Sequence, residues 1–195
     1  MKIILASGSH RRKRLLSKLA GKFSMKEAKI VERILPGEPF ASAAVRLAEM
    51  KARKVAGTES GAIVIGADTI AYLGRRIFRK TENEREARKI LSFLSGKTHH
   101  VVTGVCVLFP DAACVKYSVG AAVRMKRLEA KTINGYLKTG EWGGRAGSYD
   151  VSGKGSKLVE CVRGERETVA GLPLRRLRPL LSASSRRKNN RLRRE

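Results

Sequence analysis

The sequence contains no glutamine and only four asparagines among its 195 residues. Depletion of thermolabile amides is one mark of proteins from hot environments, and a biased genomic base composition produces the same depletion. Acidic residues are scarce too, with 17 Asp and Glu against 42 Lys and Arg, so the formal net charge is +25. A positive protein attracts polyanions such as nucleotides, nucleic acid, pyrophosphate or anionic membranes, and the charge alone does not choose among them.

Cysteine is rare as well. The chain has three, Cys106, Cys114 and Cys161, and no two of them have C-x-x-C spacing. An odd number without that spacing supports neither a disulfide framework nor a zinc knuckle, so a reduced cytoplasmic interior is the expected location. No apolar run approaches the roughly 20 residues that cross a bilayer. The apolar start of the chain is too short for a signal-peptide core, and no membrane association is expected.

The length fits one domain or two small lobes, and a hydrophobic content of 42% is enough for a core. We expect one domain over residues 1–181 and a basic, disordered tail over residues 182–195. The tail carries six basic residues and one acid, or +5, which leaves about +20 on the rest of the chain. The basic character therefore belongs to the domain as well as to the tail.

Strand-like and helix-like patterns alternate along the chain, which favours an α/β or α+β layer architecture. Thr81 and Glu84 fit a capping box at the start of the third helix, and Pro179 is expected to disturb the end of the last one. Strands are expected at residues 3–5, 23–32, 62–65, 101–108, 115–123 and 158–162, a hairpin at 70–78, and helices at 11–19, 39–56, 81–94, 132–138 and 172–181.

The segment SGSHRR, residues 7–12, follows the first expected strand and opens the first expected helix. A helix N-terminus offers free N–H donors and a partial positive charge, which suit a phosphate. Ser7 adds a hydroxyl group, and Arg11 and Arg12 add guanidinium groups that match phosphate oxygens. Cations at a helix N-terminus cost about 0.3–1 kcal/mol each, so their presence favours a bound anion. A solvated basic face beside a capping serine is the alternative.

Asp68, in the segment VIGADTI, stands just past the strand expected at residues 62–65. Open α/β sheets place their ligands beyond strand ends. A carboxylate there could bind a divalent metal or act as general base on water, and a turn-capping aspartate is the alternative. Glu32 follows the second expected strand and is a weaker candidate for a second oxygen ligand.

Lys51, on the expected helix 39–56, and Lys80, just before the capping box, are candidate phosphate ligands. Most of the 42 cations must be surface residues, so either lysine is a weak candidate on its own. His99 and His100 are adjacent and therefore lie on opposite faces of a strand, so they are not a metal-binding pair. No Ser-His-Asp or Cys-His arrangement has a spacing that supports nucleophilic catalysis.

Five segments with distinctive sequences follow one another from Ile3 to about Leu181: LASGSHRRKRLL, VIGADTI, LSGKTHHVVTGV, TGEWGGRAGSYDVSGKG and VAGLPL. They resemble the blocks LASxSPRRxxLL, GADT, LSGxxHxVxTGV, TGE…AGxYxxQGxG and VxGLPL of the Maf family of nucleotide pyrophosphatases. One such block would be weak support, whereas five in family order make the resemblance specific.

The resemblance implies a cytoplasmic enzyme with the α/β Maf (ITPase-like) fold, a curved mixed β-sheet flanked by helices, with two lobes around a central cleft and often a homodimer. It implies hydrolysis of nucleoside triphosphates to monophosphate and pyrophosphate with a divalent metal cation, Mg²⁺ or Mn²⁺. Thr69 after Asp68, together with AGSY, resembles the branch that acts on dTTP and UTP. House-cleaning of the nucleotide pool, including modified pyrimidine nucleotides, is the corresponding expectation.

The same resemblance implies individual roles. Asp68 matches the catalytic aspartate, which is proposed to activate water, and Asp68 and Glu32 would hold the metal. The substrate-binding positions are Ser7, Arg11, Arg12, Lys51, Thr69, Lys80 and Ser152.

Departures from the family pattern leave two alternatives open. Ser152 replaces a glutamine associated with base selection and is too short to reach as far, so another base preference is one alternative. His10 and Thr81 replace prolines, with little expected effect. The net charge and the basic tail are not explained by the family, and they favour a nucleic-acid-binding or cell-division regulatory module on the same fold as the competing class.

Overall fold

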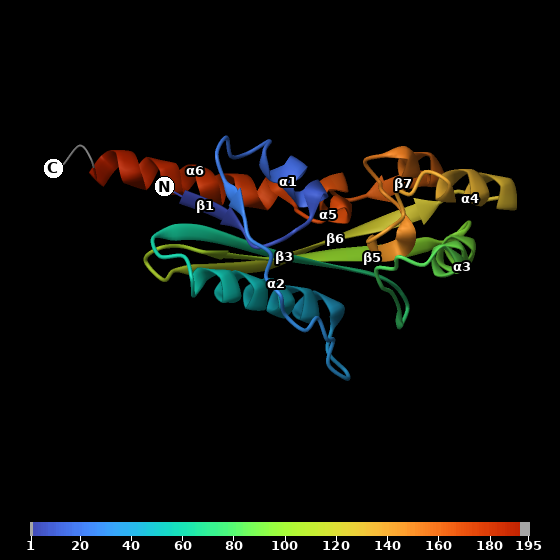
Figure 1. The fold of residues 1–195 in the computed structure, drawn as a ribbon, viewed down its shortest axis with the longest axis horizontal. Helices are drawn as coiled ribbons and strands as arrows, with labels where there is room; N and C mark the ends of the chain where they lie inside the picture. Colours follow the sequence, from blue (N-terminus) through green and yellow to red (C-terminus); the bar gives the residue numbers. More distant parts are fainter. Residues whose placement is uncertain (1, 192–195) are drawn as a thin grey trace. The chain divides into compact units, whose positions relative to one another are not determined.

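The computed structural model describes the backbone of residues 2–191 and the side chains of residues 2–182. It is a mixed α/β structure in which helices flank a sheet with strand order β2-β1-β3-β5-β6-β7 and with β4 paired to β3 (Figure 1). This confirms the fold class expected from the sequence. The chain divides into two compact units: unit 1 holds residues 1–68, 103–118 and 171–195, and unit 2 holds residues 69–102 and 119–170.

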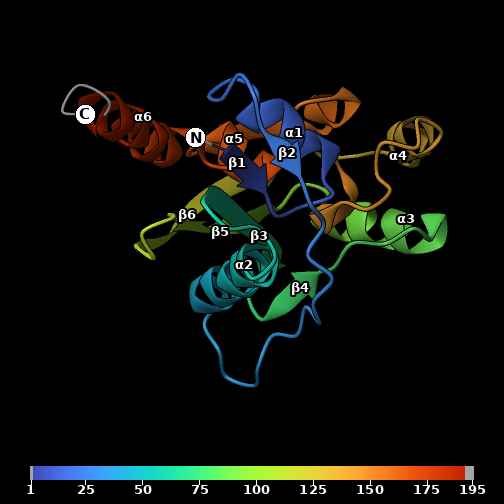
Figure 2. The ribbon, with the colours of Figure 1, turned by 60° about the vertical axis from the view of Figure 1, so that its left-hand side comes forward.

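Unit 1 is built on parallel strands. β1 (Lys2–Leu5) pairs in parallel with β2 (Ser24–Met25) and with the start of β3 (Ala62–Leu73). α1 (His10–Leu16) lies on one face of these strands and α2 (Phe40–Ala56) on the other (Figures 1 and 2). Strands covered on both faces carry near-continuous apolar runs, as residues 3–5 of β1 and 62–65 of β3 do here. Unit 1 also holds the second half of β5 (Thr98–Leu108), the start of β6 (Cys114–Met125) and α6 (Leu174–Arg191).

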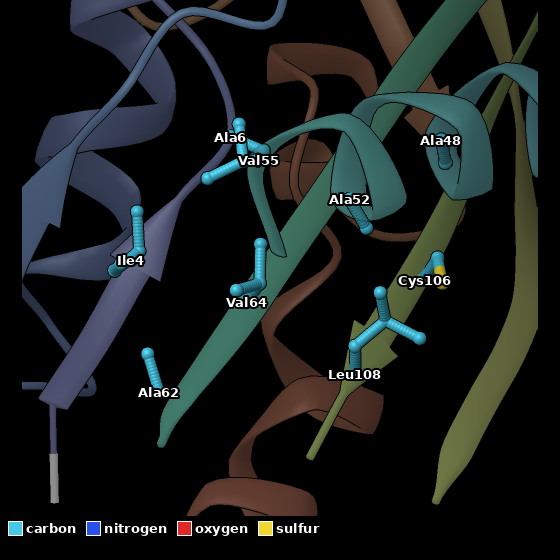
Figure 3. Packing of buried hydrophobic residues seen from close by; sticks show 9 residues of the cluster. All are labelled: Ile4, Ala6, Ala48, Ala52, Val55, Ala62, Val64, Cys106 and Leu108. Carbon is cyan, nitrogen blue, oxygen red and sulfur yellow. The ribbon is translucent and has the colours of Figure 1, made fainter. Parts of the chain in front are cut away.

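Small residues allow α2 to lie directly on the sheet. Ala44, Ala48 and Ala52 line its buried face. A Cβ atom on Gly66 of β3 would lie 2.1 Å from the Ala48 carbonyl oxygen, and one on Gly104 of β5 would lie 2.2 Å from the Ala44 carbonyl carbon. Only glycine fits at such close approach. The core of this layer contains Ile4, Ala6, Ala48, Ala52, Val55, Ala62, Val64, Cys106 and Leu108 (Figure 3).

Unit 2 contains hairpins and short helices. The second half of β3 turns at Gly74, where φ is 57°, into the antiparallel strand β4 (Arg76–Phe78), which confirms the expected hairpin. α3 (Glu84–Leu94) packs beside α4 (Ala130–Leu137) (Figure 2). The end of β6 pairs antiparallel with β7 (Val159–Arg163). The remaining elements are η1 (Ala146–Ser148), η2 (Lys154–Leu158) and α5 (Arg166–Ala170).

Two expected strand boundaries are wrong. β3 does not end at Ile65 but continues to Leu73, so Asp68 lies within the strand rather than beyond it. Gly66 is the reason, because its missing side chain admits α2 without interrupting the extended backbone. The second strand covers only Ser24–Met25, so Glu32 lies on a segment without regular structure.

Two helix ends differ from those expected from the sequence. Asn83, not Thr81, caps α3: its Oδ1 accepts from the Glu86 N–H at 3.2 Å, whereas Thr81 Oγ1 accepts from the Asn83 N–H. Asn83, which directly precedes the first residue of the helix, therefore occupies the N-cap position. α6 continues past Pro179, although proline removes one backbone donor.

The backbone of residues 182–191 is helical, whereas the sequence predicts a disordered tail there, and residues 192–195 lie outside the described residues. The division of the chain at residue 181 stays a prediction. Among the helices described, none is both long enough and apolar enough to span a membrane.

Candidate active site

Lys51 occupies the centre of a charge cluster in unit 1. Its Nζ lies 2.5 Å from Asp68 Oδ1 and 2.6 Å from Glu32 Oε1. The side chains of Lys51 and Asp68 are each 6% exposed, whereas that of Glu32 is 43% exposed. One ammonium group is therefore shared by a buried and an exposed carboxylate. Two carboxylates around one cation leave an excess of negative charge that attracts further cations.

The packing of α2 on β3 explains why these side chains meet. Asp68 stands two residues after Gly66 on β3, so both face α2. Lys51 stands three residues after Ala48 on α2 and shares its buried face. Because Gly66 lets the helix backbone approach the strand closely, the Lys51 ammonium reaches the Asp68 carboxylate.

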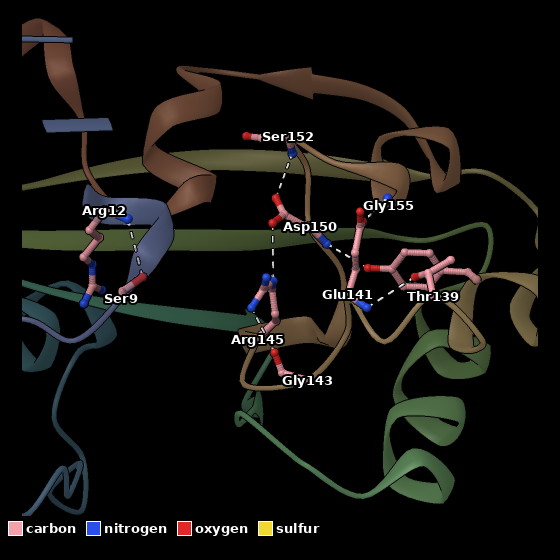
Figure 4. A network of polar contacts seen from close by, with 10 residues as sticks. Ser9, Arg12, Thr139, Glu141, Gly143, Arg145, Asp150, Ser152 and Gly155 are labelled. Carbon is pink, nitrogen blue, oxygen red and sulfur yellow. Dashed lines mark hydrogen bonds and ion pairs between the residues drawn. The ribbon is translucent and has the colours of Figure 1, made fainter. Parts of the chain in front are cut away.

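Arg12 is held in place by groups on both sides of its guanidinium. It is 6% exposed, its Nε donates to the Gly171 carbonyl oxygen at 2.8 Å, and its Nη1 donates to Ser7 Oγ at 3.3 Å. Ser9 is the N-cap of α1, and its Oγ accepts from the Arg12 N–H at 3.5 Å (Figure 4). These bonds fix both the backbone and the side chain of Arg12.

The charge of Arg12 is coupled to the Lys51 cluster. Burial lowers the pKa of Arg12, and the negative charges of Asp68 and Glu32 act in the opposite direction. The two carboxylates are therefore close enough to influence the guanidinium through space. Arg11, next to Arg12 on α1, is half-buried. The structure thus gathers in unit 1 the predicted site residues Ser7, Arg11, Arg12, Glu32, Lys51 and Asp68.

Gly171 is not predicted from the sequence as a residue of this site. Its carbonyl oxygen receives the Arg12 Nε bond, and its φ of 104° lies in a region that favours glycine. The glycine of the VAGLPL segment is the only signal that could have indicated it. A backbone acceptor has no side-chain pattern, which is why the sequence conceals its role.

Thr69, Lys80 and Ser152, the other predicted substrate-binding residues, belong to unit 2. Thr69 is half-buried and follows Asp68 on β3, and Lys80 is exposed between β4 and α3. Ser152 is exposed, and its backbone N–H donates to Asp150 Oδ1 at 3.0 Å. The roles of these three residues stay predictions.

A polar network fixes the segment of unit 2 that carries Ser152 (Figure 4). Asp150 is buried, and its Oδ2 forms an ion pair with Arg145 Nε at 3.3 Å. The Asp150 N–H donates to Tyr136 Oη at 3.0 Å, and burial raises the pKa of Tyr136 to about 12. Glu141 accepts from the Gly155 N–H at 3.3 Å. The position of Ser152 is therefore set by buried neighbours although its own side chain is exposed.

Asp68 and Glu32 are the residues of unit 1 that could hold a divalent cation. Each binds the Lys51 ammonium through one oxygen, Asp68 Oδ1 or Glu32 Oε1, and carboxylate oxygens are the ligands that Mg²⁺ prefers. Among the described residues, no group of three or more His, Cys, Asp or Glu could hold a metal ion. Two carboxylates nevertheless fit Mg²⁺, because this ion commonly completes its shell with water and substrate phosphates.

Fold and site together define an α/β protein with cations and carboxylates clustered in one unit. A family profile described as Maf-like protein matches residues 2–184. The dTTP/UTP pyrophosphatase of Aquifex aeolicus (strain VF5) is 41% identical over 181 residues, which cover 93% of this chain and 94% of that protein. The dTTP/UTP pyrophosphatase of Clostridioides difficile (strain 630) is 40% identical over 183 residues, again 93% and 94% of the two chains. The chain belongs to the family of Maf-like proteins.

Solved structures give a weaker likeness. A HAM1 protein from Coxiella burnetii matches with a TM-score of 0.49 and 14% identity over 94% of this chain and 99% of that chain.

Proposed function

We propose that this protein is a nucleoside triphosphate pyrophosphatase that hydrolyses dTTP and UTP to the monophosphate and pyrophosphate, and that it cleanses the nucleotide pool of modified pyrimidine nucleotides. One observation carries the proposal: the Lys51 ammonium shared by Asp68 and Glu32, with the buried Arg12 close by. Proteins named dTTP/UTP pyrophosphatase, 40% and 41% identical to this chain, support the substrate class.

The cations of the cluster suit a triphosphate. A nucleoside triphosphate carries several negative charges, and attack on its α-phosphorus concentrates more charge on the phosphoryl oxygens. Arg11, Arg12 and Lys51 would neutralise this charge where it develops, and Ser7 would donate a hydrogen bond. Thr69 and Lys80 of unit 2 are the further substrate-binding residues of the proposal.

Asp68 is the residue that would direct water. Its carboxylate accepts the proton as the water oxygen attacks the α-phosphorus, the bond from that phosphorus to the bridging oxygen breaks, and pyrophosphate leaves. A Mg²⁺ or Mn²⁺ ion held by Asp68 and Glu32 would lower the pKa of bound water and neutralise phosphate oxygens. Lys51 keeps the Asp68 side chain oriented through the bond at 2.5 Å.

Base preference depends on unit 2 in this proposal. Ser152 stands where the family pattern has glutamine, and a serine side chain offers only a short hydroxyl group. The buried network around Asp150 holds the backbone of this segment, so the base would meet a fixed surface. Preference for the pyrimidine base is therefore the part of the proposal that a substrate panel tests most directly.

The experiment is a panel of purified nucleotides with Mg²⁺ or Mn²⁺, in which monophosphate and pyrophosphate are both measured. We expect turnover of dTTP and UTP, and a loss of about 10²–10⁴-fold in kcat for Asp68→Asn. Glu160→Gln is the matched control, because Glu160 is an exposed acid of β7 whose ion pair with Arg124 spans 3.6 Å. Turnover of no nucleotide, or an unchanged Asp68→Asn enzyme, contradicts the proposal. A purine preference would overturn only the substrate class.

The net charge of +25 favours a second candidate function, the binding of nucleic acid. Exposed cations such as Lys13, Arg14 and Lys18 on and after α1 would contact phosphates. Binding of this kind weakens steeply as salt rises, because each phosphate contact releases counterions. A salt titration on single-stranded and duplex DNA measures it, and deletion of residues 182–195 shows how much of it belongs to the tail.

A homodimer and a cytoplasmic location, both implied by the family resemblance, stay predictions. Light scattering of the purified chain measures the first, and fractionation of cells that express it measures the second.

A further inference from the structure

Two of the three thiol groups lie close together in unit 1. Cys106 is on β5, and Cys114 begins β6, the next strand of the sheet. The two strands are joined by a turn in which the Phe109 N–H donates to the Ala113 carbonyl oxygen at 2.9 Å. This hairpin brings Cys106 Sγ to 3.7 Å from Cys114 Sγ, although seven residues separate them in the sequence.

The two sulfur atoms have different surroundings. Cys106 is fully buried and packs in the core cluster that contains Ala48 and Ala52 of α2 (Figure 3). Cys114 is exposed. Burial raises the pKa of the Cys106 thiol to about 12, with smaller contributions from Cys114 and Glu49. The exposed sulfur is therefore the one that a dissolved oxidant reaches first, and the buried sulfur lies 3.7 Å from it.

Charged side chains surround the exposed sulfur. Lys116, two residues after Cys114 on β6, and Arg53 of α2 are both bound to Glu49, at 2.8 Å and 2.7 Å. Both cations lie within electrostatic range of Cys114. The exposed sulfur therefore lies in a polar, solvent-accessible setting, unlike the buried Cys106.

We propose that Cys106 and Cys114 form a site of reversible oxidation, at which a hydroperoxide converts the two thiols to a disulfide. With hydrogen peroxide as the oxidant, the Cys114 thiol releases its proton to solvent and the resulting thiolate attacks one peroxide oxygen. The O–O bond breaks, and a sulfenic acid forms as the second oxygen takes up a proton and leaves as water. The Cys106 sulfur then attacks the Cys114 sulfur, the S–O bond breaks, and the hydroxyl group takes up the Cys106 proton and leaves as a second water. The peroxide gains the two electrons that the sulfur atoms lose.

The geometry limits which side chain moves. A disulfide requires the sulfur atoms to approach to about 2.05 Å. Cys106 is enclosed by the core, so the exposed Cys114 side chain makes the rotation at the start of β6. Cys161, the third cysteine, is exposed on β7 of unit 2 and serves as an internal control.

The test uses the full chain, first reduced with dithiothreitol and freed of it, then exposed to hydrogen peroxide. We expect the intact mass to fall by two hydrogen atoms, two of the three thiols to disappear, and a proteolytic fragment to link Cys106 to Cys114. Dithiothreitol should restore the starting mass. Cys161→Ser should leave the mass loss unchanged, because Cys161 takes no part.

Variants at the pair complete the test. In Cys114→Ser the mass loss should disappear, and this exposed position is the safer one for folding. In Cys106→Ser the exposed sulfur should gain oxygen instead, because no second thiol is near it to resolve the sulfenic acid. Oxygen addition to the unaltered chain without a link, a link that includes Cys161, or a link between two chains would each overturn the proposal.

Discussion

Lys51 Nζ lies 2.5 Å from Asp68 Oδ1, and both side chains are almost entirely shielded from water. A buried ion pair recovers the cost of desolvation only when its geometry is good and its remaining polar atoms have partners. Glu32 supplies a second partner for the ammonium from the exposed side. The same pair therefore joins α2 to β3 and places an acid and a base at the candidate active site.

Removal of the ammonium tests the structural part of this relationship. Lys51→Met keeps the length of the apolar stem but leaves Asp68 buried without its ion-pair partner. We expect the free energy of unfolding to fall by about 3–5 kcal/mol, the cost of one unpaired buried charge. Urea denaturation measures it, with the exposed Lys54 of α2 as control in Lys54→Met. Equal stability of the two variants would show that the pair does not support the helix.

Arg12→Lys tests the two hydrogen bonds that hold the Arg12 guanidinium in place. Lysine has no planar group that could bind Ser7 Oγ and the Gly171 carbonyl oxygen together. We expect a loss of about 1.5–3 kcal/mol in the free energy of unfolding, the contribution of a hydrogen bond to a charged group. If the proposed function holds, KM for dTTP should also rise about tenfold.

The control for Arg12 lies on the same helix. Arg14 is exposed near the end of α1, so Arg14→Lys should change neither the stability nor KM. A KM that rises equally in both variants would mean that the effect does not depend on the fixed guanidinium group of Arg12.

Much of the fold could be predicted because the apolar pattern follows the burial. The helix expected at residues 39–56 is α2, which runs from Phe40 to Ala56. The helix expected at residues 81–94 contains α3, whose buried residues Ala87, Ile90, Leu91 and Leu94 recur at helical spacing. Periodic burial is a local property, and the sequence records it directly.

The exceptions depend on contacts distant in sequence. Gly66 looks like the end of a strand, because glycine usually weakens one, and nothing local reveals the helix that packs against it. For the candidate site, the sequence indicates Lys51 and Asp68 separately, but the bond between them depends on the packing of α2 on β3. Gly171 contributes only a carbonyl oxygen, which every residue has.

Gly66→Ala tests the close approach that places Lys51 beside Asp68. The added Cβ would lie 2.1 Å from the Ala48 carbonyl oxygen, so α2 must move away from β3. We expect a loss of about 1–3 kcal/mol or more in stability, as for other overpacked cores, and a fall in activity. Gly120→Ala on β6 is the control, because a Cβ there meets no atom within 4 Å. A Gly66→Ala variant with unchanged stability and activity would mean that α2 tolerates the movement away from β3.

His99 gives the fold a predicted dependence on pH. Its Nε2 lies 2.9 Å from Tyr149 Oη, and burial, with a smaller contribution from His100, lowers the pKa of His99 to about 4. In the unfolded chain a histidine has a pKa of about 6.5. Between these two values the unfolded state takes up a proton that the folded state refuses, so acid favours unfolding. Above about pH 6.5 both states are neutral, and His99 adds no pH dependence.

The expected size of this effect is a loss of about 1.4 kcal/mol per pH unit below pH 6.5, reaching about 3 kcal/mol near pH 4. Urea denaturation at a series of pH values measures it, and His99→Gln should flatten this part of the profile. His100→Gln is the matched control: His100 is exposed on the next position of β5 and makes only the smaller contribution to the lowered pKa of His99, so most of the slope should persist in this variant. Carboxylates that titrate in the same pH range contribute equally to the slope in every variant, so their contribution cancels when the variants are compared. A slope that persists in His99→Gln would assign the acid sensitivity to those carboxylates and not to the buried imidazole.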